Sequence, residues 1–331
     1  MAERMVENLN RALQASLAAN PSTYLVGEDL VDPYGGAFKA AKGLSTQFPQ
    51  QVISTPISEE GLLAFANGLA LCGDRAIAEI MFGDFAALGF DQILNVAAKT
   101  VSMYGKRRRH NLIVRIPVGG HRGYGATHSQ SLQKHFIGIP DLELHELSPF
   151  HDSTDVFEAM WASDKPCLHF ESKVLYTQDF IGAPATAGRL RVDMLEGGVA
   201  RAFLPDAGVP EALILTHGSC ALMALEAARE LFVEHEIVAE VLVPSRLYPF
   251  AETLPLLTSS PARVFTVEEC VAGGTWGESL AAHLQRQQPG REPVITLASL
   301  AAVIPSAPLL EKQVLVSKDR IVDEIRRVLR P

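Results

Sequence analysis

Residues 76–117 read AIAEIMFGDFAALGFDQILNVAAKTVSMYGKRRRHNLIVRIP, and this stretch decides the predicted fold. Apolar runs at 76–82 and 112–117 flank a helix-like pattern at 88–104. Two buried strands joined by a helix of this length predict a parallel sheet, because parallel neighbours need a long crossover connection. The stretch therefore predicts an α/β fold.

The same alternation continues on both sides of this stretch. Met5, Leu9 and Leu13 are four positions apart, which predicts an N-terminal helix with one apolar face. We predict further strands at 24–26, 142–147, 167–170, 213–216, 238–243, 264–267 and 294–297. We predict further helices at 61–71, 129–136, 156–161, 221–233, 275–285 and 318–329.

The chain is predicted to hold two domains, each a mainly parallel sheet flanked by helices. Its 331 residues suit two domains of about 150 residues each. The expected first domain covers 1–180 and the second, smaller one covers 211–331. Residues 181–210 are rich in Gly, Ala and Pro and have little periodicity, so we expect a linker there.

Charge and composition exclude several classes of protein. The net charge of −9 argues against nucleic-acid binding, which needs a basic surface. No apolar run approaches the roughly 18 residues of a membrane span, and no signal-peptide pattern opens the chain. The four cysteines include no Cys-x-x-Cys pair, which is typical of reduced thiols rather than a disulfide framework. We expect a soluble cytoplasmic protein.

The segment at 55–61 contains a candidate acid. Ser58 is a good helix N-cap, and Glu59 and Glu60 suit the first turn of the helix that follows, so a purely capping role is one interpretation. Residues 62–71 are apolar nearly all round, which predicts a buried helix. A carboxylate at the start of such a helix is suited to sharing a proton with a ligand nitrogen.

Two loops that follow predicted strands contain further candidates. Phe85 follows the strand at 76–82, where it offers a stacking face, although Phe82 and Phe85 could both be core residues. The loop at 117–131 has four glycines within seven positions, which indicates close backbone approach or positive φ. His128 in this loop is a candidate acid or base, and the alternative is that residues 127–129 cap the next helix. The glycine spacing does not match a dinucleotide-binding fingerprint.

Taken together, these segments resemble one enzyme family. It is the beta subunit of the decarboxylating component of 2-oxo acid dehydrogenases, which includes the pyruvate, branched-chain and acetoin enzymes. The resemblance covers nearly the whole chain and is most specific at 24–176. The motifs that carry it are Gly-Glu-Asp (27–29), Tyr-Gly-Gly-Ala-Phe (34–38), Thr-Pro-Ile-Ser-Glu (55–59), Glu-Ile-Met-Phe (79–82), Phe-Asp-Gln-Ile (90–93), Ala-Ala-Lys (97–99) and Arg-Gly-Tyr-Gly-x-Thr-His-Ser-Gln-Ser (122–131).

The resemblance implies a site for the aminopyrimidine ring of thiamine diphosphate in the first domain. The glutamate matching Glu59 hydrogen-bonds a pyrimidine nitrogen and so promotes deprotonation of the thiazolium carbon. Phe85 matches the aromatic residue that stacks on the pyrimidine. His128 matches a histidine that assists acyl transfer to the lipoyl acceptor. Glu28 matches an acid on the pyrimidine side of the site, and Met81 matches a residue beside that acid.

The resemblance also implies a partner chain. The family holds the diphosphate and magnesium through a Gly-Asp-Gly motif, and this sequence has none; 73–75 and 83–85 lack the third glycine. We therefore expect an alpha-type subunit with that motif and an α2β2 assembly. The sequence departs from the family pattern at 178–212, 243–249 and 294–304. Whether the chain docks to a lipoyl acyltransferase is therefore not decided by the resemblance. Some members hold potassium near positions matching Leu112, Met160, Trp161, Ser163 and Lys165, but the serine replaces an acid and the lysine is cationic.

The expected function is decarboxylation of a 2-oxo acid, with transfer of the acyl group to a lipoyl acceptor. Two alternatives remain. One is a carboligase that joins the intermediate to an aldehyde, as in transketolase-like and acyloin-forming relatives. The other is a beta-type scaffold without catalysis. The sequence does not fix which 2-oxo acid is used.

Overall fold

The computed structural model describes residues 2–250 and 253–330, and the chain divides into two compact units. The first comprises Met1–Val118, Gly138–His145 and Asp152–Phe180, and the second Gly119–Ile137, Glu146–His151 and Ile181–Pro331. The last segment of the first unit ends at Phe180. Two short segments inside 1–180 belong to the second unit, and one of them carries His128.

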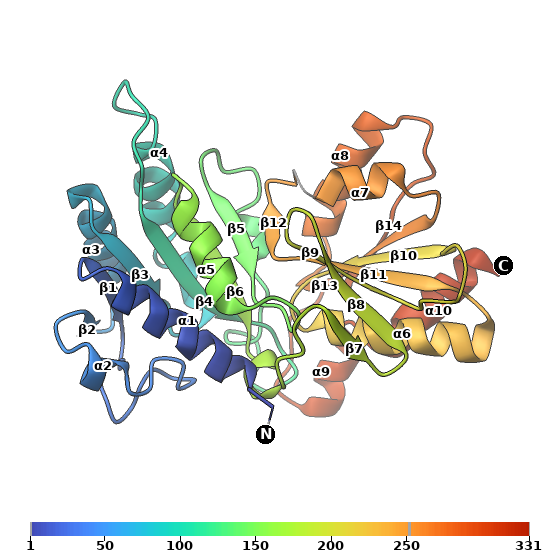
Figure 1. Cartoon of the computed structure of the whole chain (residues 1–331), viewed down its shortest axis with the longest axis horizontal. Helices are drawn as coiled ribbons and strands as arrows, with labels where there is room; N and C mark the ends of the chain where they lie inside the picture. The colour runs from blue at the N-terminus through green and yellow to red at the C-terminus, as the bar shows by residue number, and fades with distance from the viewer. Residues whose placement is uncertain (1, 251–252, 331) are drawn as a thin grey trace. The chain divides into compact units, whose positions relative to one another are not determined.

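The first unit contains one sheet covered by helices (Figure 1). Within it the strand order is β5-β6-β4-β3-β1-β2. β1 pairs in parallel with β2 and β3, β3 with β4, and β4 with β6, so the predicted parallel sheet is confirmed. The strands are β1 (Thr23–Gly27), β2 (Val52–Ser54), β3 (Arg75–Glu79), β4 (Leu112–Val118), β5 (Glu143–Glu146) and β6 (Cys167–Ser172).

Among the described residues of this unit, the α-helices are α1 (Met5–Ala19), α2 (Leu44–Gln47), α3 (Glu59–Cys72), α4 (Ala98–Thr100) and α5 (Ser153–Ala162). Met5, Leu9 and Leu13 are fully buried, as their spacing predicts, and α1 lies beside α5 (Figure 1). The helix expected at 88–104 is irregular, with a π-helical stretch at Gln92–Ala97 before α4. Short 3₁₀ turns lie at Gly83–Ala87 and Leu175–Thr177.

The second unit contains a seven-stranded sheet in the order β14-β13-β10-β11-β9-β8-β7 (Figure 1). Its strands are β7 (Ala185–Ala187), β8 (Leu190–Leu195), β9 (Val199–Phe203), β10 (Ala212–Thr216), β11 (Ala239–Pro244), β13 (Arg263–Val271) and β14 (Ile295–Ser299), and β12 (Arg246–Tyr248) is a further short strand. Its helices are α6 (Cys220–His235), α7 (Thr253–Ser259), α8 (Trp276–Gln287), α9 (Pro308–Val314) and α10 (Lys318–Leu329).

The expected linker at 181–210 is instead part of this sheet. It forms β7, β8 and β9, which pair antiparallel, and β9 also pairs antiparallel with β11. Leu190 and Val192 are buried while Arg191 is exposed, so a two-residue period is present. Glycine-containing turns separate these short strands, so no single strand is long enough for its two-residue period to be recognised in the sequence.

The predicted helix at 129–136 is also wrong. Only a 3₁₀ turn at Gln133–His135 forms there. The segment makes tertiary contacts within its own unit instead: Lys134 Nζ donates to the carbonyl oxygens of Val271 (2.9 Å) and Gly273 (3.0 Å), and Cys270 Sγ lies 3.1 Å from the Ser131 carbonyl oxygen. These contacts hold the backbone in a non-helical path.

Apolar packing between helices and sheet stabilises the second unit. α10 lies beside α6, and its Ile321, Val322 and Ile325 are buried, so the helix predicted at 318–329 is confirmed. Among residues 2–250 and 253–330, no helix has the length and apolar character to cross a membrane.

Candidate functional site

Glu28 and Glu59 form an acidic pair in the first unit. Glu28 directly follows β1, and Glu59 is the first residue of α3; each is only 6% exposed. Ser58 caps α3, and its Oγ accepts a 3.3 Å hydrogen bond from Gly61 N. Burial, and then the charge of Glu59, raise the pKa of Glu28. The two carboxyl groups are therefore close enough to interact, and Glu28 holds a proton more readily than an ordinary glutamate.

One oxygen of the pair, Glu28 Oε1, and the nearby Thr55 Oγ1 are buried without a hydrogen-bond partner among the residues described. Thr55 N donates a 2.9 Å hydrogen bond to Gly27 O, which places the threonine beside the end of β1. A buried polar atom without a partner costs free energy. These atoms, at the carboxyl ends of parallel strands, suit a polar ligand that supplies the missing partners.

Aromatic side chains gather after β3. Phe82 meets Phe38 edge-on with ring centroids 5.4 Å apart, and Phe85 at 6.1 Å. Met81, Phe82 and Phe85 are each partly exposed, so none of them is an ordinary core residue. A Cβ at Gly83 would lie 2.8 Å from Pro117 O, so glycine lets the turn containing Phe85 pack against β4. Phe85 thus offers a partly exposed ring at the end of β3.

A buried ionic network lies among the central strands of this unit, and the sequence analysis missed it. Arg115 is fully buried; its Nε and Nη2 each donate a 2.8 Å hydrogen bond to Glu171, and its Nη1 bonds Glu79. His169 Nδ1 lies 2.9 Å from Glu171 Oε1, and Tyr176 OH donates to Oε2 at 2.6 Å. Arg115 is the one charged residue of β4, and a charge within an apolar strand indicates a buried ionic partner.

The two carboxyl groups of this network differ in pKa. Burial raises the pKa of Glu79, and the charge of Arg115 offsets only part of this effect. For Glu171 burial also disfavours the charge, but Arg115 and His169 outweigh it and lower the pKa to about 2. A Cβ at Gly36, where φ is +78°, would lie 2.7 Å from Glu79 Oε1. Glycine there lets the loop at 34–38 pass directly over Glu79.

Part of α3 is exposed, contrary to the expectation of a buried helix. Leu62, Leu63 and Ala66 are buried, but Phe65 is 46% exposed and Leu71 44% exposed. Ile57 (81% exposed) lies two residues before the start of α3. Leu88 (62% exposed) precedes Gly89, which packs against Leu63 of α3. We call Ile57, Phe65, Leu71 and Leu88 the α3 apolar face.

His128 lies in the second unit, in the loop at 119–131, which we call the histidine loop. His128 is partly exposed, and its Nδ1 lies 3.0 Å from Thr127 Oγ1. No regular helix follows, so these residues do not cap one. Glu28, Glu59, Met81 and Phe85 thus all belong to the first unit, whereas His128 belongs to the second.

Two carboxylates anchor the histidine loop. Gly120 N donates a 2.5 Å hydrogen bond to Glu269 Oε1, and His121 Nε2 lies 3.5 Å from Glu269 Oε2. Gly123 N donates to Glu311 Oε2 at 3.2 Å. Glu269 is 6% exposed and Glu311 3% exposed. The loop is therefore held at two points by buried acceptors.

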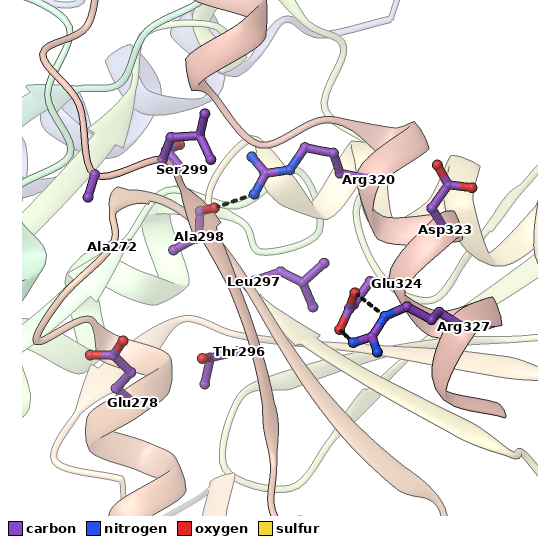
Figure 2. A pocket seen from close by; sticks show the side chains of 12 residues that line it. Ala272, Glu278, Thr296, Leu297, Ala298, Ser299, Arg320, Asp323, Glu324 and Arg327 are labelled. Atoms are coloured by element: carbon purple, nitrogen blue, oxygen red, sulfur yellow. Dashed lines mark hydrogen bonds and ion pairs between the residues drawn. The ribbon is translucent and has the colours of Figure 1, made fainter. Parts of the chain in front are cut away.

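The described part of the second unit contains several pockets, among them one beside the histidine loop and one along β14. One of about 470 Å³ adjoins the histidine loop and is lined by Gln130, Lys134, His135, Val303 and neighbouring residues. The other, of about 520 Å³, runs along β14, where Arg320 Nη2 donates to Ala298 O at 3.0 Å and Arg327 bonds Glu324 (Figure 2). None of the sequence-predicted site residues lines either pocket.

The residues considered for potassium make contacts that do not suit that ion. The guanidinium of Arg109 donates to the carbonyl oxygen of Trp161. Lys165 Nζ lies 3.4 Å from Glu143 Oε1, and Ser163 Oγ accepts from Lys165 N at 3.2 Å. Leu112 is buried in β4. The Arg109 guanidinium already bonds the Trp161 carbonyl oxygen, which a potassium ion at these positions would need as a ligand.

Comparisons with known proteins agree with this architecture. The family described as "Transketolase, pyrimidine binding domain" matches residues 4–178, and "Transketolase, C-terminal domain" matches 204–321. A split gene transketolase, solved as an inactive beta4 tetramer, has a TM-score of 0.74 at 19% identity and covers 98% of both chains. This likeness shows the fold.

Curated relatives extend the comparison along the chain. A pyruvate dehydrogenase E1 component subunit beta from Leifsonia xyli is 35% identical over 173 residues, which is 52% of this chain and 51% of the relative. An acetoin:2,6-dichlorophenolindophenol oxidoreductase subunit beta from Cupriavidus necator is 28% identical over 97% of this chain and 96% of its own. A 2-oxoisovalerate dehydrogenase subunit beta from Bacillus subtilis is 28% identical over 98% of this chain and 97% of the relative. The chain belongs to the transketolase pyrimidine-binding-domain family, and a transketolase C-terminal domain follows that domain.

Proposed function

We propose that this chain is the beta-type subunit of a two-chain, thiamine-diphosphate-dependent 2-oxo acid dehydrogenase. Its reaction would be decarboxylation of a 2-oxo acid, with transfer of the acyl group to a lipoyl acceptor. The observation that carries the proposal is the buried pair Glu28 and Glu59, at the strand ends of a pyrimidine-binding domain. Relatives that align over nearly the whole chain are named as beta subunits of dehydrogenases and oxidoreductases.

The residues around this pair fit an aminopyrimidine ring. Such a ring has nitrogen donors and acceptors, and Glu28 Oε1 and Thr55 Oγ1 are buried oxygens in need of partners. When bound, thiamine diphosphate supplies the electron sink for decarboxylation. Glu59 would share a proton with a ring nitrogen, and Glu28, whose pKa is raised by burial and by the charge of Glu59, would hydrogen-bond the ligand from the same side.

Phe85 and Met81 would hold the ring in place. Phe85 is partly exposed at the end of β3, so one of its faces can stack on a heterocycle. Met81 has an adaptable thioether side chain that packs well against aromatic ligands. His128 would handle a proton during transfer to the acceptor, and the loop contacts to Glu269 and Glu311 would limit its movement.

The proposed partner is an alpha-type chain that holds the diphosphate and magnesium through a Gly-Asp-Gly motif. This chain lacks that motif. The α3 apolar face starts two residues before Glu59 and exposes four large apolar side chains. An exposed apolar patch beside a binding site is typical of a protein interface. We propose that the alpha-type chain covers this face, in an α2β2 assembly in the cytoplasm.

The substrate and acceptor are open to a direct experiment. The chain would be co-expressed with an alpha-type chain that carries a Gly-Asp-Gly motif, and the complex supplied with pyruvate, branched-chain 2-oxo acids or acetoin. Reduction of a lipoyl domain by a 2-oxo acid supports the proposal. Turnover only with an aldehyde acceptor would point to carboligation, and complex formation without any turnover would point to a scaffold.

A further inference from the structure

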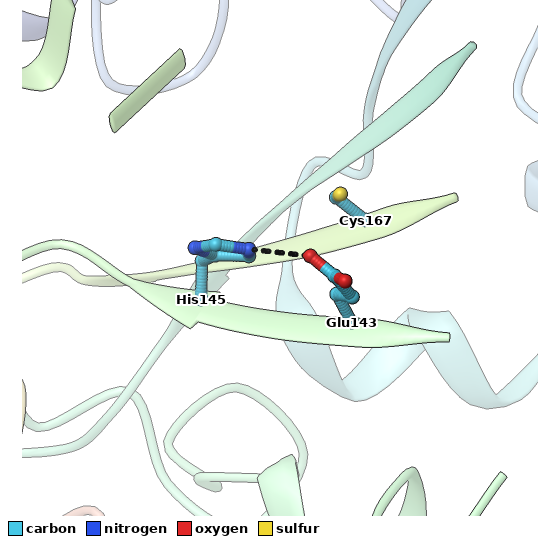
Figure 3. Close-up of side chains that lie close together, drawn as sticks. All are labelled: Glu143, His145 and Cys167. Carbon is cyan, nitrogen blue, oxygen red and sulfur yellow. Dashed lines mark ion pairs between the residues drawn. The ribbon is translucent and has the colours of Figure 1, made fainter. Parts of the chain in front are cut away.

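A buried thiol, imidazole and carboxylate converge in the first unit, and none of them belongs to the proposed cofactor residues. They belong to Cys167, His145 and Glu143, and one donor atom from each lies within 4.8 Å of the others (Figure 3). The side chain of His145 is 5% exposed and that of Glu143 7%, and Cys167 is fully buried. We propose that these three side chains form a binding site for a zinc-class divalent metal ion.

The backbone sets this convergence. Glu143 and His145 are two positions apart on β5, so their side chains point to the same face of the strand. Cys167 is the first residue of β6, the neighbouring strand, and Glu143 N donates a 3.1 Å hydrogen bond to Pro166 O. This hydrogen bond fixes the strand register that brings the thiol beside the other two donors.

The spacing of the donors suits a tetrahedral ion. Zinc binds sulfur at about 2.3 Å and nitrogen or oxygen at about 2.0–2.2 Å, so its ligand atoms lie roughly 3.3–3.8 Å from one another. His145 Nε2 and Glu143 Oε2 are already 3.5 Å apart. The carbonyl oxygen of Lys165 lies 3.6 Å from Cys167 Sγ and is within reach as a fourth ligand. Small side-chain rotations would bring the donors around a single ion.

The chemistry of the donors selects the class of metal. A thiolate with an imidazole and a carboxylate favours zinc and similar ions over magnesium, calcium or potassium, which prefer oxygen ligands. Lys165 Nζ lies 3.4 Å from Glu143 Oε1, the oxygen that does not face His145, so the lysine orients the carboxylate with Oε2 toward the site.

The position of the site indicates a structural ion. Glu143 and Cys167 each begin their strands, whereas Glu28 follows the carboxyl end of β1 in the same sheet. The ion would therefore lie at the amino ends of β5 and β6, whereas the proposed cofactor residue Glu28 lies at the carboxyl end of β1. It would cross-link β5 to β6 and take no part in decarboxylation. The inference is independent of the proposed function.

Cobalt binding to the full-length chain tests the site directly. The purified chain would be stripped with chelator and titrated with Co²⁺, whose bond to a thiolate gives a near-ultraviolet charge-transfer band. We expect one Co²⁺ per chain with this band, and zinc should displace it and raise the melting temperature. Cys220→Ser is the matched control, because Cys220 is also fully buried but lies in the second unit.

The variants separate this site from adventitious binding. Cys167→Ser should abolish the band, and His145→Asn should weaken Co²⁺ binding at least tenfold, while Cys220→Ser keeps both. If Cys167→Ser does not fold, His145→Asn and Glu143→Gln carry the test. Wild-type chain that shows no thiolate band under saturating Co²⁺, or a band that survives removal of Cys167, overturns the proposal.

Discussion

Gly120 and Glu269 are joined by a 2.5 Å hydrogen bond from the glycine N–H to the carboxylate Oε1. This contact ties the start of the histidine loop to β13, where a register irregularity lies between Val267 and Val271. The adjacent Glu268 faces elsewhere and accepts from the backbone N–H groups of Trp276 and Gly277. Two consecutive carboxylates therefore fix two different segments of the second unit.

We expect Glu269→Ala to loosen the histidine loop. It removes a buried charge-assisted acceptor, which is worth about 1.5–3 kcal/mol, so amide hydrogen exchange at 119–123 should accelerate about 10- to 100-fold. Hydrogen-exchange mass spectrometry of the isolated chain measures this change. Glu226→Ala, at an exposed position on α6, should leave the loop unchanged. Equal exchange rates in both variants would contradict an anchoring role.

Removal of Arg115 should strongly destabilise the first unit. Arg115→Met leaves Glu79 and Glu171 buried without their cation, and breaking a buried ion pair costs about 3–5 kcal/mol. Urea unfolding of the isolated chain measures the loss. Arg107 also pairs with two acids but is half-exposed, so Arg107→Met should change stability little. An Arg115 variant as stable as the Arg107 variant would show that the network contributes little to stability.

Stability should depend on the protonation of Glu28. Because burial and the charge of Glu59 raise the pKa of Glu28, the folded state favours its protonated form. This group therefore lowers the free energy of unfolding as pH rises above 4.5, its ordinary value, toward the raised value. Glu28→Gln should stabilise the isolated chain at pH 7, by less than about 2 kcal/mol, and should have no such effect below pH 4.

The control for Glu28 is Glu158→Gln, at an exposed position on α5. Its unfolding free energy should match the wild type at both pH values. A Glu28→Gln variant that is less stable than wild type at pH 7 would mean that the charged form of Glu28 has stabilising partners. That result would remove the acidic pair as an argument for a ligand site.

The α3 apolar face should be needed for binding of the alpha-type chain. Phe65→Glu puts a charge on a surface that we propose is buried in the complex, so co-purification should fall at least tenfold while the isolated chain stays folded. Val233→Glu is the matched control, because Val233 is similarly exposed on α6 in the second unit. Undiminished complex formation by Phe65→Glu would place the partner elsewhere.

Much of the fold could be predicted from the sequence because its strongest patterns are local. Mainly apolar runs such as 112–117, interrupted only by Arg115, are typical of strands buried on both faces, and β4 is buried throughout. The capping residue Ser58 and the apolar residues after it predicted α3. The exposure of Phe65 could not be predicted, because a helix that is apolar all round gives no sign of which face awaits a separate chain.

The other errors arose where long-range contacts outweigh local pattern. Residues 129–136 have helical periodicity, but Lys134 is held by carbonyl groups near residues 271–273. Turns within 181–210 separate three short strands, of which β9 pairs with β11, and the short strands could not be recognised from the sequence. For the candidate site, Glu28, Glu59 and Phe85 could be named from motifs. The Arg115 network and the Glu269 anchor depend on partners 36 to 149 residues away in the chain.

Cofactor-dependent turnover of the Glu59→Gln variant, reconstituted with an alpha-type chain, tests the central claim most directly. Glutamine keeps the shape of Glu59 but cannot share a proton with a ring nitrogen, so kcat should fall about 10²- to 10⁴-fold while the complex still assembles. Glu60→Gln, the exposed neighbour in the same helical turn, should keep wild-type turnover. A Glu59→Gln complex with kcat within twofold of wild type would contradict the account.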